Sequence, residues 1–311
     1  MAKLRRNHSK ASGGGLLSKS VVFAGIVGGL LFLFNMFNAE ETEATEREFK
    51  EPKSQSVEIE FSDDGYILPE DFFPTSTTGQ IIKHTYYAMS YNEKYEQPEW
   101  VAYELTKESI RKPNVKRSGN FRPDPKVRKA SASKTDYRGS GYDRGHLVPA
   151  GDMAFNKKAM SETFFMSNMS PQIHNFNSGI WRQLEESVRD WAWDNKHLYV
   201  VTGPVLTRGI LDEIGPNDVA VPEEYYKVIL DYTQPSLKGI AFLMPNEVST
   251  KPMMDYAVSI DEIEKITGID FFTEIDDADE AKLESTFDVR AWRVDGNKER
   301  ARIHTMEKLR K

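Results

Sequence analysis

Cysteine is absent from this chain of 311 residues. Its absence excludes a disulfide scaffold, a zinc or iron–sulfur site with cysteine ligands, and a catalytic thiol. It assigns no redox compartment, because a chain without cysteine is compatible with any. No internal repeat is visible in the sequence either. Any catalytic site must therefore be built from other side chains within an ordinary globular domain.

A net positive charge is lacking as well, since 41 Lys+Arg stand against 48 Asp+Glu and give −7. Taken as one number, this charge argues against a protein that acts on nucleic acid. The distribution argues otherwise. Residues 107–144 hold twelve basic and four acidic residues, a net charge of about +8. A basic run is usually a solvated surface, but this one leads directly into a group of candidate catalytic residues.

Long apolar runs are scarce, and the one that occurs lies at residues 21–37, between a basic start and an acidic continuation. As a helix it would reach about 25 Å, slightly short of a bilayer core. We expect an uncleaved transmembrane anchor, with a cleaved signal peptide and a buried core helix as alternatives. The basic end should stay cytoplasmic, which places the remainder in the cell envelope or periplasm. Cleavage would make the protein secreted instead.

The chain divides into four expected parts: a basic tail with the anchor (1–39), an acidic tether (40–81), a globular domain (82–292) and a basic C-terminal extension (293–311). Within the globular domain, short β-branched and aromatic runs predict strands at 84–89, 100–105, 198–203, 225–231 and 239–244. Helices are expected at 179–195 and 259–267, and the acidic stretch 276–280 is expected to be a solvated loop rather than a calcium site. Because strands and helices do not alternate regularly, the pattern favours an α+β fold.

The helix at 179–195 has a core-facing stripe with three- and four-residue spacing: Ile180, Leu184, Val188 and Trp191. Asn177 precedes this helix and Glu185 follows two turns later. A hard cation such as Mg²⁺ prefers oxygen ligands and keeps several waters. At 100° per residue, the two side chains lie about 80° apart on one helix flank. The alternative is that Asn177 caps the helix and Glu185 is a solvated acid.

The densest cluster of candidate catalytic groups is at residues 142–147, where His146 lies close to Arg144. A histidine beside an arginine can accept a proton from water while the guanidinium engages a phosphate oxygen. A lone histidine is more often structural, so the assignment depends on the residues that follow it.

Those residues carry a family resemblance. The segment 143–185 resembles the DNA/RNA non-specific endonucleases, the family of mitochondrial endonuclease G and the secreted bacterial nucleases. Its Asp-Arg-Gly-His signature is present at 143–146, an Asn-x-x-Pro-Gln element at 168–172, and an Asn-x-x-x-Trp-x-x-Leu-Glu helix start at 177–185. Further matches occur near 201–204, 221–228 and 244–246, so the resemblance spans about residues 82–290.

The resemblance implies a ββα-metal, or His-Me finger, core, with a largely antiparallel sheet and a long metal-bearing helix. By match, His146 is the general base and Asn177 is the direct Mg²⁺ ligand. Glu185 reaches the metal through water, and Asn168 orients the site. Mn²⁺ is the alternative metal.

The resemblance also implies how the substrate is held. Arg144 contacts the phosphate, while Asp143 and Gly145 hold the geometry of the motif. An upstream arginine is expected near the scissile phosphate, and Arg117 and Arg122 are both candidates.

Together these features predict a membrane-anchored, Mg²⁺-dependent endonuclease that cleaves DNA and RNA with little sequence preference and leaves 5′-phosphate ends. Non-specific cleavage follows because the basic segment binds the phosphate backbone without reading bases. Two alternatives remain: a nucleic-acid-binding protein that has lost catalysis, and a metal-dependent phosphodiesterase with another substrate. The family's common dimeric state adds a second copy of the chain to the expected partners.

Overall fold

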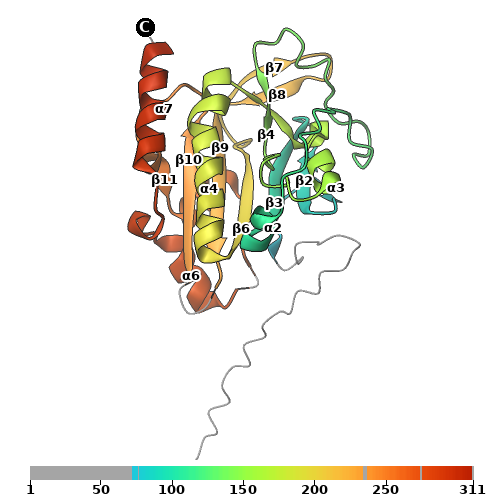
Figure 1. Ribbon diagram of the computed structural model, residues 1–311. Coiled ribbons are helices and arrows are strands. Elements are labelled where there is room, and N and C mark those ends of the chain that lie inside the picture. The colour runs from blue at the N-terminus through green and yellow to red at the C-terminus, as the bar shows by residue number, and fades with distance from the viewer. Residues whose placement is uncertain (1–71, 76, 234–236, 274, 310–311) are drawn as a thin grey trace, which may run out of the picture. The chain divides into compact units, whose positions relative to one another are not determined.

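The computed structural model describes residues 72–75, 77–233, 237–273 and 275–309 (Figure 1). The expected membrane anchor at 21–37 and most of the expected tether lie outside the described residues. Within the described part of the chain, no helix is long and apolar enough to cross a bilayer.

A seven-stranded antiparallel sheet is the centre of the described part, with the strand order β1-β2-β3-β6-β9-β10-β11. Its strands are β1 (Gln80–Lys83), β2 (Tyr87–Asn92), β3 (Gln97–Thr106), β6 (His197–Pro204), β9 (Glu224–Asp231), β10 (Lys238–Pro245) and β11 (Ala257–Val258). The expected α+β class and largely antiparallel sheet are therefore confirmed. All five strands expected from sequence exist, with ends that differ from the expected ones by at most three residues.

Side chains of the central strands alternate between two hydrophobic cores, as a two-residue repeat requires. On β3, Val101, Tyr103 and Leu105 enter one core, whereas Trp100 and Ala102 enter the other. Because both faces of the sheet are covered, β3 is buried along nearly its whole length.

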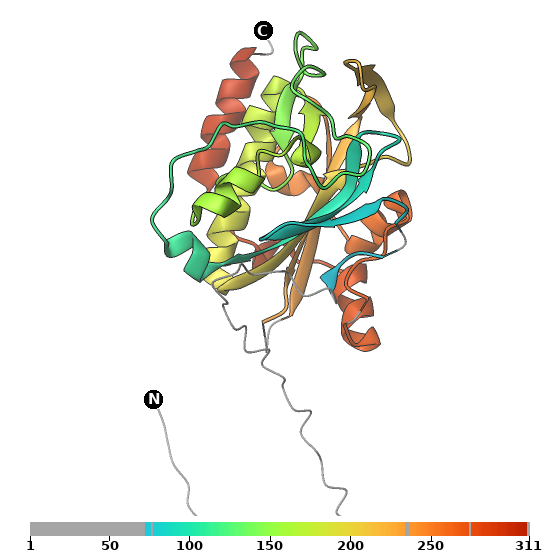
Figure 2. The same cartoon turned by 90° about the vertical axis from the view of Figure 1, so that its right-hand side faces the viewer.

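Helices cover both faces of this sheet, and Figure 2 shows the sheet lying between these helices. One face carries α4 (Arg182–Asn195), with α2 (Lys107–Arg111) and α7 (Gly296–Leu309) packed against α4. The other face carries α5 (Ile260–Thr267) and α6 (Asp277–Ser285). The stripe expected on the long helix is confirmed, since Ile180, Leu184, Val188 and Trp191 are all buried.

Two predictions about helices were wrong in detail. The long helix begins with a π-helical segment, η3 (Phe176–Trp181), in which Gly179 has φ −103° and ψ −109°. Counting 100° per residue from Asn177 to Glu185 therefore fails, because the backbone is not α-helical throughout. The acidic stretch after residue 275 is also no loop: Asp276 caps α6 by accepting a hydrogen bond from the Ala278 N–H.

A smaller two-stranded pair, β4 (Asp143–His146) and β5 (Met169–Gln172), carries the signature residues. Gly145 faces Ser170 in this pair, and a Cβ on Gly145 would clash with the side chain of Gln172. With Gln172 in this position, only glycine fits. Along the chain, α3 (Lys157–Glu162) and a short 3₁₀ turn, η2 (Met166–Asn168), connect β4 to β5. The remaining pair, β7 (Ile210–Ile214) with β8 (Val219–Pro222), contacts β5 through β8.

Candidate active site

His146 ends β4, and its ring packs beside two phenylalanine rings that also contact each other. Phe121 and Phe164 approach its imidazole edge-on, with ring centroids 5.8 Å and 4.9 Å away. The side chain is 9% exposed, and its Nε2 atom has no hydrogen-bond partner among the described residues. A buried imidazole nitrogen without a partner is free to accept a proton from a ligand or from water.

Each of these rings also supports an arginine. The Arg144 guanidinium lies 4.5 Å from the Phe121 ring centroid, and that of Arg117 lies 5.0 Å from the Phe164 centroid. Stacking on an aromatic face holds a guanidinium in place while its N–H groups remain available to an anion. We name this group of His146, Phe121, Phe164, Arg117 and Arg144 the histidine cradle.

Arg122, the other upstream arginine considered from sequence, makes different contacts from those of Arg117. Its guanidinium donates to the Asn120 and Ser161 carbonyl oxygens and to Ser161 Oγ, and stacks on Phe165 at 4.0 Å. Phe165 packs against His84 rather than His146. The geometry therefore leaves the Arg117 guanidinium available to an anion, whereas the Arg122 guanidinium holds the backbone at Asn120 and Ser161.

The cradle keeps His146 neutral. Burial lowers the pKa of His146 to about 3, and the positive charges of Arg117 and Arg144 act in the same direction. A hydrogen bond with the backbone of Arg144 opposes them. The free protein therefore presents the unprotonated imidazole that a general base requires.

Asn177 is oriented by the signature aspartate. Its Nδ2 donates to Asp143 Oδ2 at 2.9 Å, and His174 Nδ1 lies 2.9 Å from the same oxygen. The side chain of Asn177 therefore does not cap the helix, contrary to the alternative considered from sequence. Because the amide nitrogen is engaged, the position of Oδ1 is fixed, and no described residue donates a hydrogen bond to it.

Asn168 holds the loop that follows His146. Its Oδ1 accepts from the Val148 N–H, while its Nδ2 donates to the Val148 and Thr163 carbonyl oxygens. The side chain is fully buried and all its hydrogen-bonding groups are used, so Asn168 positions the site rather than touching a substrate. Asn246 does the same for β5, since it bonds Ile173, Pro171 and Pro222.

Glu185 lies among charged groups that sequence reasoning did not single out. Lys227 is fully buried on β9, its Nζ lies 4.8 Å from the Trp181 ring centroid, and no described group accepts a hydrogen bond from it. Burial raises the pKa of Glu185, whereas the positive charge of Lys227 opposes the rise. The positive charge of Arg117 also lowers the pKa of Glu185, as it lowers that of His146.

A second layer fixes this charged group. Arg189 Nη1 lies 2.6 Å from Asp152 Oδ1, and the Tyr103 hydroxyl donates to Asp152 Oδ2 at 2.8 Å. Asp152 and Arg189 both act on Glu185 electrostatically. Two features of the sequence point to these charged residues. Lys227 lies in the family match at 221–228, and Arg189 follows Glu185 by one helical turn.

The donor set suits a hard divalent cation. Asn177 Oδ1 accepts no hydrogen bond from the described residues, and neither does the Glu185 carboxylate. An oriented amide oxygen and a partly buried carboxylate are the ligand types that Mg²⁺ accepts alongside water.

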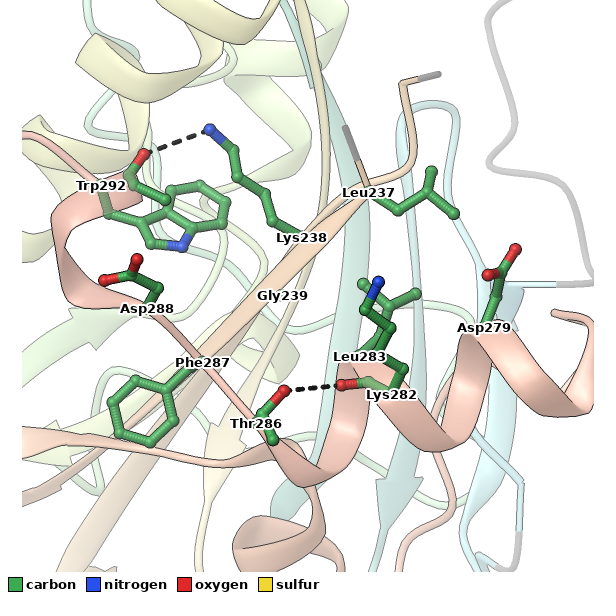
Figure 3. Close-up of a pocket in the computed structure, with 11 residues that line it drawn as sticks. Leu237, Lys238, Gly239, Asp279, Lys282, Leu283, Thr286, Phe287, Asp288 and Trp292 are labelled. Atoms are coloured by element: carbon green, nitrogen blue, oxygen red, sulfur yellow. Dashed lines mark hydrogen bonds between the residues drawn. The ribbon is translucent and has the colours of Figure 1, made fainter. Parts of the chain in front are cut away.

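The pocket shown in Figure 3 is not this site. It has a volume of about 530 Å³ and lies between β10, α6 and the segment up to Trp292. Lys238 there is already engaged by Asn195 and by the Ala291 carbonyl. None of the residues that line the pocket is a histidine or one of the predicted site residues.

The basic segment 107–144 runs without a strand or helix from the end of α2 to β4. Two of its acids are turned inward: Asp124 contacts His84 and Ser167, and Asp136 is bonded by Asn217 and Ser133. Nine of its basic residues are exposed: Arg111, Lys112, Lys116, Arg117, Lys126, Arg128, Lys129, Lys134 and Arg138. The surface beside the histidine cradle is therefore more positive than the sequence count suggests.

Comparisons with known proteins agree with this geometry. Residues 68–278 match the family described as DNA/RNA non-specific endonuclease. The chain is 36% identical over 227 residues to human mitochondrial nuclease EXOG, covering 68% of this chain and 61% of that relative. It is 34% identical over 240 residues to nuclease C1 of Cunninghamella echinulata var. echinulata, covering 72% of this chain and 90% of that protein.

A solved structure is also similar. The crystal structure of an EndoG/EndoGI complex contains a chain that is 35% identical, with a TM-score of 0.60. The match covers 65% of this chain and 89% of that chain. The fold expected from the signature residues is thereby confirmed.

Proposed function

The chain belongs to the DNA/RNA non-specific endonuclease family, and on that premise we propose that it hydrolyses phosphodiester bonds within DNA and RNA. The observation that carries the proposal is the histidine cradle, in which a buried neutral imidazole contacts two phenylalanine rings and each ring carries an arginine guanidinium. Hydrolysis of a phosphodiester needs a base for water and positive charge for the phosphoryl oxygens. The cradle provides both.

In this mechanism His146 takes a proton from the attacking water through Nε2. Arg117 and Arg144 hold the phosphate from two sides, each guanidinium supported by its aromatic ring. The negative phosphate offsets the charge of the arginines and raises the pKa of His146, so the imidazole becomes a stronger base when substrate is bound. Asn168 fixes the backbone of Val148, two residues after His146, and so holds the loop that follows the base.

Asn177 and Glu185 are the residues that would hold a divalent metal ion, which we propose to be Mg²⁺, with Mn²⁺ as a substitute. When bound, the ion supplies Lewis-acid stabilisation of the phosphate and of the departing 3′ oxygen. Asp143 directs the Asn177 oxygen toward this position by engaging the amide nitrogen. Loss of the 3′ oxygen as leaving group gives products with 5′-phosphate and 3′-hydroxyl ends.

The deciding experiment incubates the purified protein with supercoiled plasmid and with RNA, each with Mg²⁺ or with a chelator. We expect nicking of both substrates with Mg²⁺ and none with chelator. His146→Ala should reduce the rate about 10²–10⁴-fold, the usual contribution of a general base. Chelator-resistant cleavage, or a His146→Ala protein as active as the parent, would overturn the proposal.

A matched control is His84→Ala, which removes another buried histidine that contacts Asp124 and lies outside the cradle. It should lower stability while leaving the cleavage rate of the folded protein within a few-fold of the parent. Equal loss of rate in both variants would indicate a folding defect and not the loss of a base.

For localisation, we propose a membrane-anchored protein with its catalytic domain on the non-cytoplasmic side, resting on the apolar run at 21–37. N-terminal sequencing of the membrane fraction tests it. A mature chain that starts near Glu40 would show a cleaved signal instead.

A further inference from the structure

Three acidic side chains converge on the face of the sheet opposite α4. Asp261 and Glu264 come from α5, and Glu284 comes from α6. One carboxylate oxygen of each lies within 4.8 Å of the other two. Leu283, next to Glu284, packs in the same core as Ile260 and Ile263, so the rigid packing of the two helices fixes this approach.

Glu284 is the unusual member of this acidic trio. Glu284 is only 8% exposed, and its Oε1 atom is buried with no hydrogen-bond partner among the described residues. A buried carboxylate without a donor or a cation is strongly disfavoured in a folded protein. In the folded protein Glu284 is therefore neutralised either by a proton or by a bound cation.

Among the described residues, no basic group forms an ion pair with Glu284. The largest charge effects on its pKa come from acids, namely Glu264, Glu280, Asp261 and Asp270. Burial and then these negative charges raise the pKa of Glu284. Glu264 is only partly satisfied, since its Oε1 accepts a hydrogen bond from the Phe271 N–H at 2.8 Å.

Ca²⁺ is the cation that suits these three oxygens. Two oxygens on the same Ca²⁺ ion can stand up to about 5 Å apart, because each Ca–O bond is about 2.3–2.6 Å long, and this limit includes every separation within the trio. Mg²⁺, with bonds of about 2.0–2.1 Å, demands near-ideal octahedral geometry. Ca²⁺ also tolerates irregular geometry and completes its shell with water, which the exposed side of Asp261 admits.

We propose that Asp261, Glu264 and Glu284 form a Ca²⁺ site that joins α5 to α6, separate from the catalytic centre on the other face of the sheet. Bound Ca²⁺ neutralises the buried Glu284 carboxylate and holds the two helices together. Its role is stabilisation of the domain, so the ion should not be needed for cleavage.

The test is thermal unfolding of the chelator-stripped full chain, with and without 10 mM Ca²⁺. With a Kd near 1 mM, in the range of extracellular modules, Ca²⁺ should raise the Tm by about 3–5 °C. Glu284→Gln keeps the shape of the side chain and removes its charge. It should raise the Tm of the metal-free protein and abolish the response to Ca²⁺, while leaving Mg²⁺-dependent plasmid cleavage unchanged.

Three controls make the result decisive. Glu262→Gln changes an exposed acid on α5 outside the trio and should keep the full Ca²⁺ response. Asn177→Ala, which disables the proposed catalytic metal site, should keep it too. Asp261→Asn, at an exposed position that does not threaten folding, should weaken it. A shift that survives in Glu284→Gln, disappears in Asn177→Ala, or is absent from the parent protein would overturn the proposal.

Discussion

The chemistry at the scale of single residues depends on how His146 is surrounded. Two aromatic rings remove water from the imidazole, and two arginines add positive charge beside it. Both effects disfavour the imidazolium form. An anionic substrate reverses only the second effect. In the proposed mechanism, the arginines that bind the phosphate also lower the pKa of the His146 base in the free protein, and bound phosphate weakens that effect.

Arg117→Gln tests this coupling between charge and base strength. The pKa of His146 is lowered in the free protein, and the pH profile of kcat/KM reports pKa values of the free enzyme. The acidic limb of this profile should therefore lie well below pH 6.5. Removing the Arg117 charge raises the pKa of His146 and moves that limb to higher pH. Burial, the largest cause, remains, so the limb should stay below pH 6.5. Loss of the phosphate contact should also lower kcat/KM by about 10–100-fold at neutral pH.

Arg122→Gln is the matched control, since it removes the other upstream arginine. It breaks hydrogen bonds to Asn120 and Ser161, and we expect the free energy of unfolding to fall by about 1–3 kcal/mol. The pH profile should not move. If Arg122→Gln shifted the acidic limb and Arg117→Gln did not, the assignment of the phosphate-binding arginine would be reversed.

Sequence reasoning reached the signature residues but not their neighbours. His146, Asn177 and Glu185 could be named because they lie at fixed spacing in recognisable motifs. Lys227 could not be assigned to the site, because its approach to Glu185 depends on how β9 pairs beneath α4. The choice between Arg117 and Arg122 depended likewise on which phenylalanine each one stacks on, and no local pattern contains that information.

At the scale of elements, the site depends on the close approach of β4 and β5. Gly145 permits that approach, because the side chain of Gln172 fills the space that a Cβ would need. The pairing places Asp143 and His146 on one short strand. It therefore sets the positions of the base and of the residue that orients Asn177 together.

Gly145→Ala should disrupt both positions at once. Overpacking of a filled space costs about 1–3 kcal/mol, so we expect the free energy of unfolding to fall by that amount and the cleavage rate to fall with it. Gly145→Ala combined with Gln172→Ala should regain part of the stability, because the second change empties the space that the new methyl group needs. Denaturant unfolding of the two variants and of Gln172→Ala alone measures this. Equal stability of the single and double glycine variants would contradict the packing argument.

Elements with strong patterns were predictable and those with special backbone were not. The stripe on α4 and the apolar runs of β6, β9 and β10 follow directly from side-chain periodicity. The π-helical start at Phe176–Trp181 does not, because it differs from an α-helix by a backbone shift that leaves no mark in hydrophobic spacing. Strands β4 and β5, at four residues each, are too short to show a period.

At the scale of the whole molecule, charge is sorted between surfaces. The exposed cations of residues 107–144 adjoin the histidine cradle, whereas the acidic trio of Asp261, Glu264 and Glu284 lies across the sheet. A net charge of −7 conceals this separation. A polyanion approaching the molecule meets attraction near the active site and repulsion near α5 and α6.

The salt dependence of DNA binding tests this sorting. In the His146→Ala background, the logarithm of the binding constant for a DNA duplex should fall linearly with the logarithm of salt concentration, because bound cations release counterions. Changing both Lys112 and Lys116 to Gln should weaken binding and make the slope shallower by about two, one for each lost phosphate contact. Both lysines are exposed and carry no ion pair within the described residues, so the change should leave folding intact.

The control pair is Lys265→Gln with Lys282→Gln, which removes the same charge from exposed positions on α5 and α6. If attraction came from the total charge of the molecule, both pairs would weaken binding equally. If it comes from the surface next to the cradle, only the first pair should change the slope, because charges farther than about 8–10 Å from the phosphates are largely screened at physiological salt. Equal slopes for the two double variants would show that residues 107–144 do not form the nucleic-acid surface.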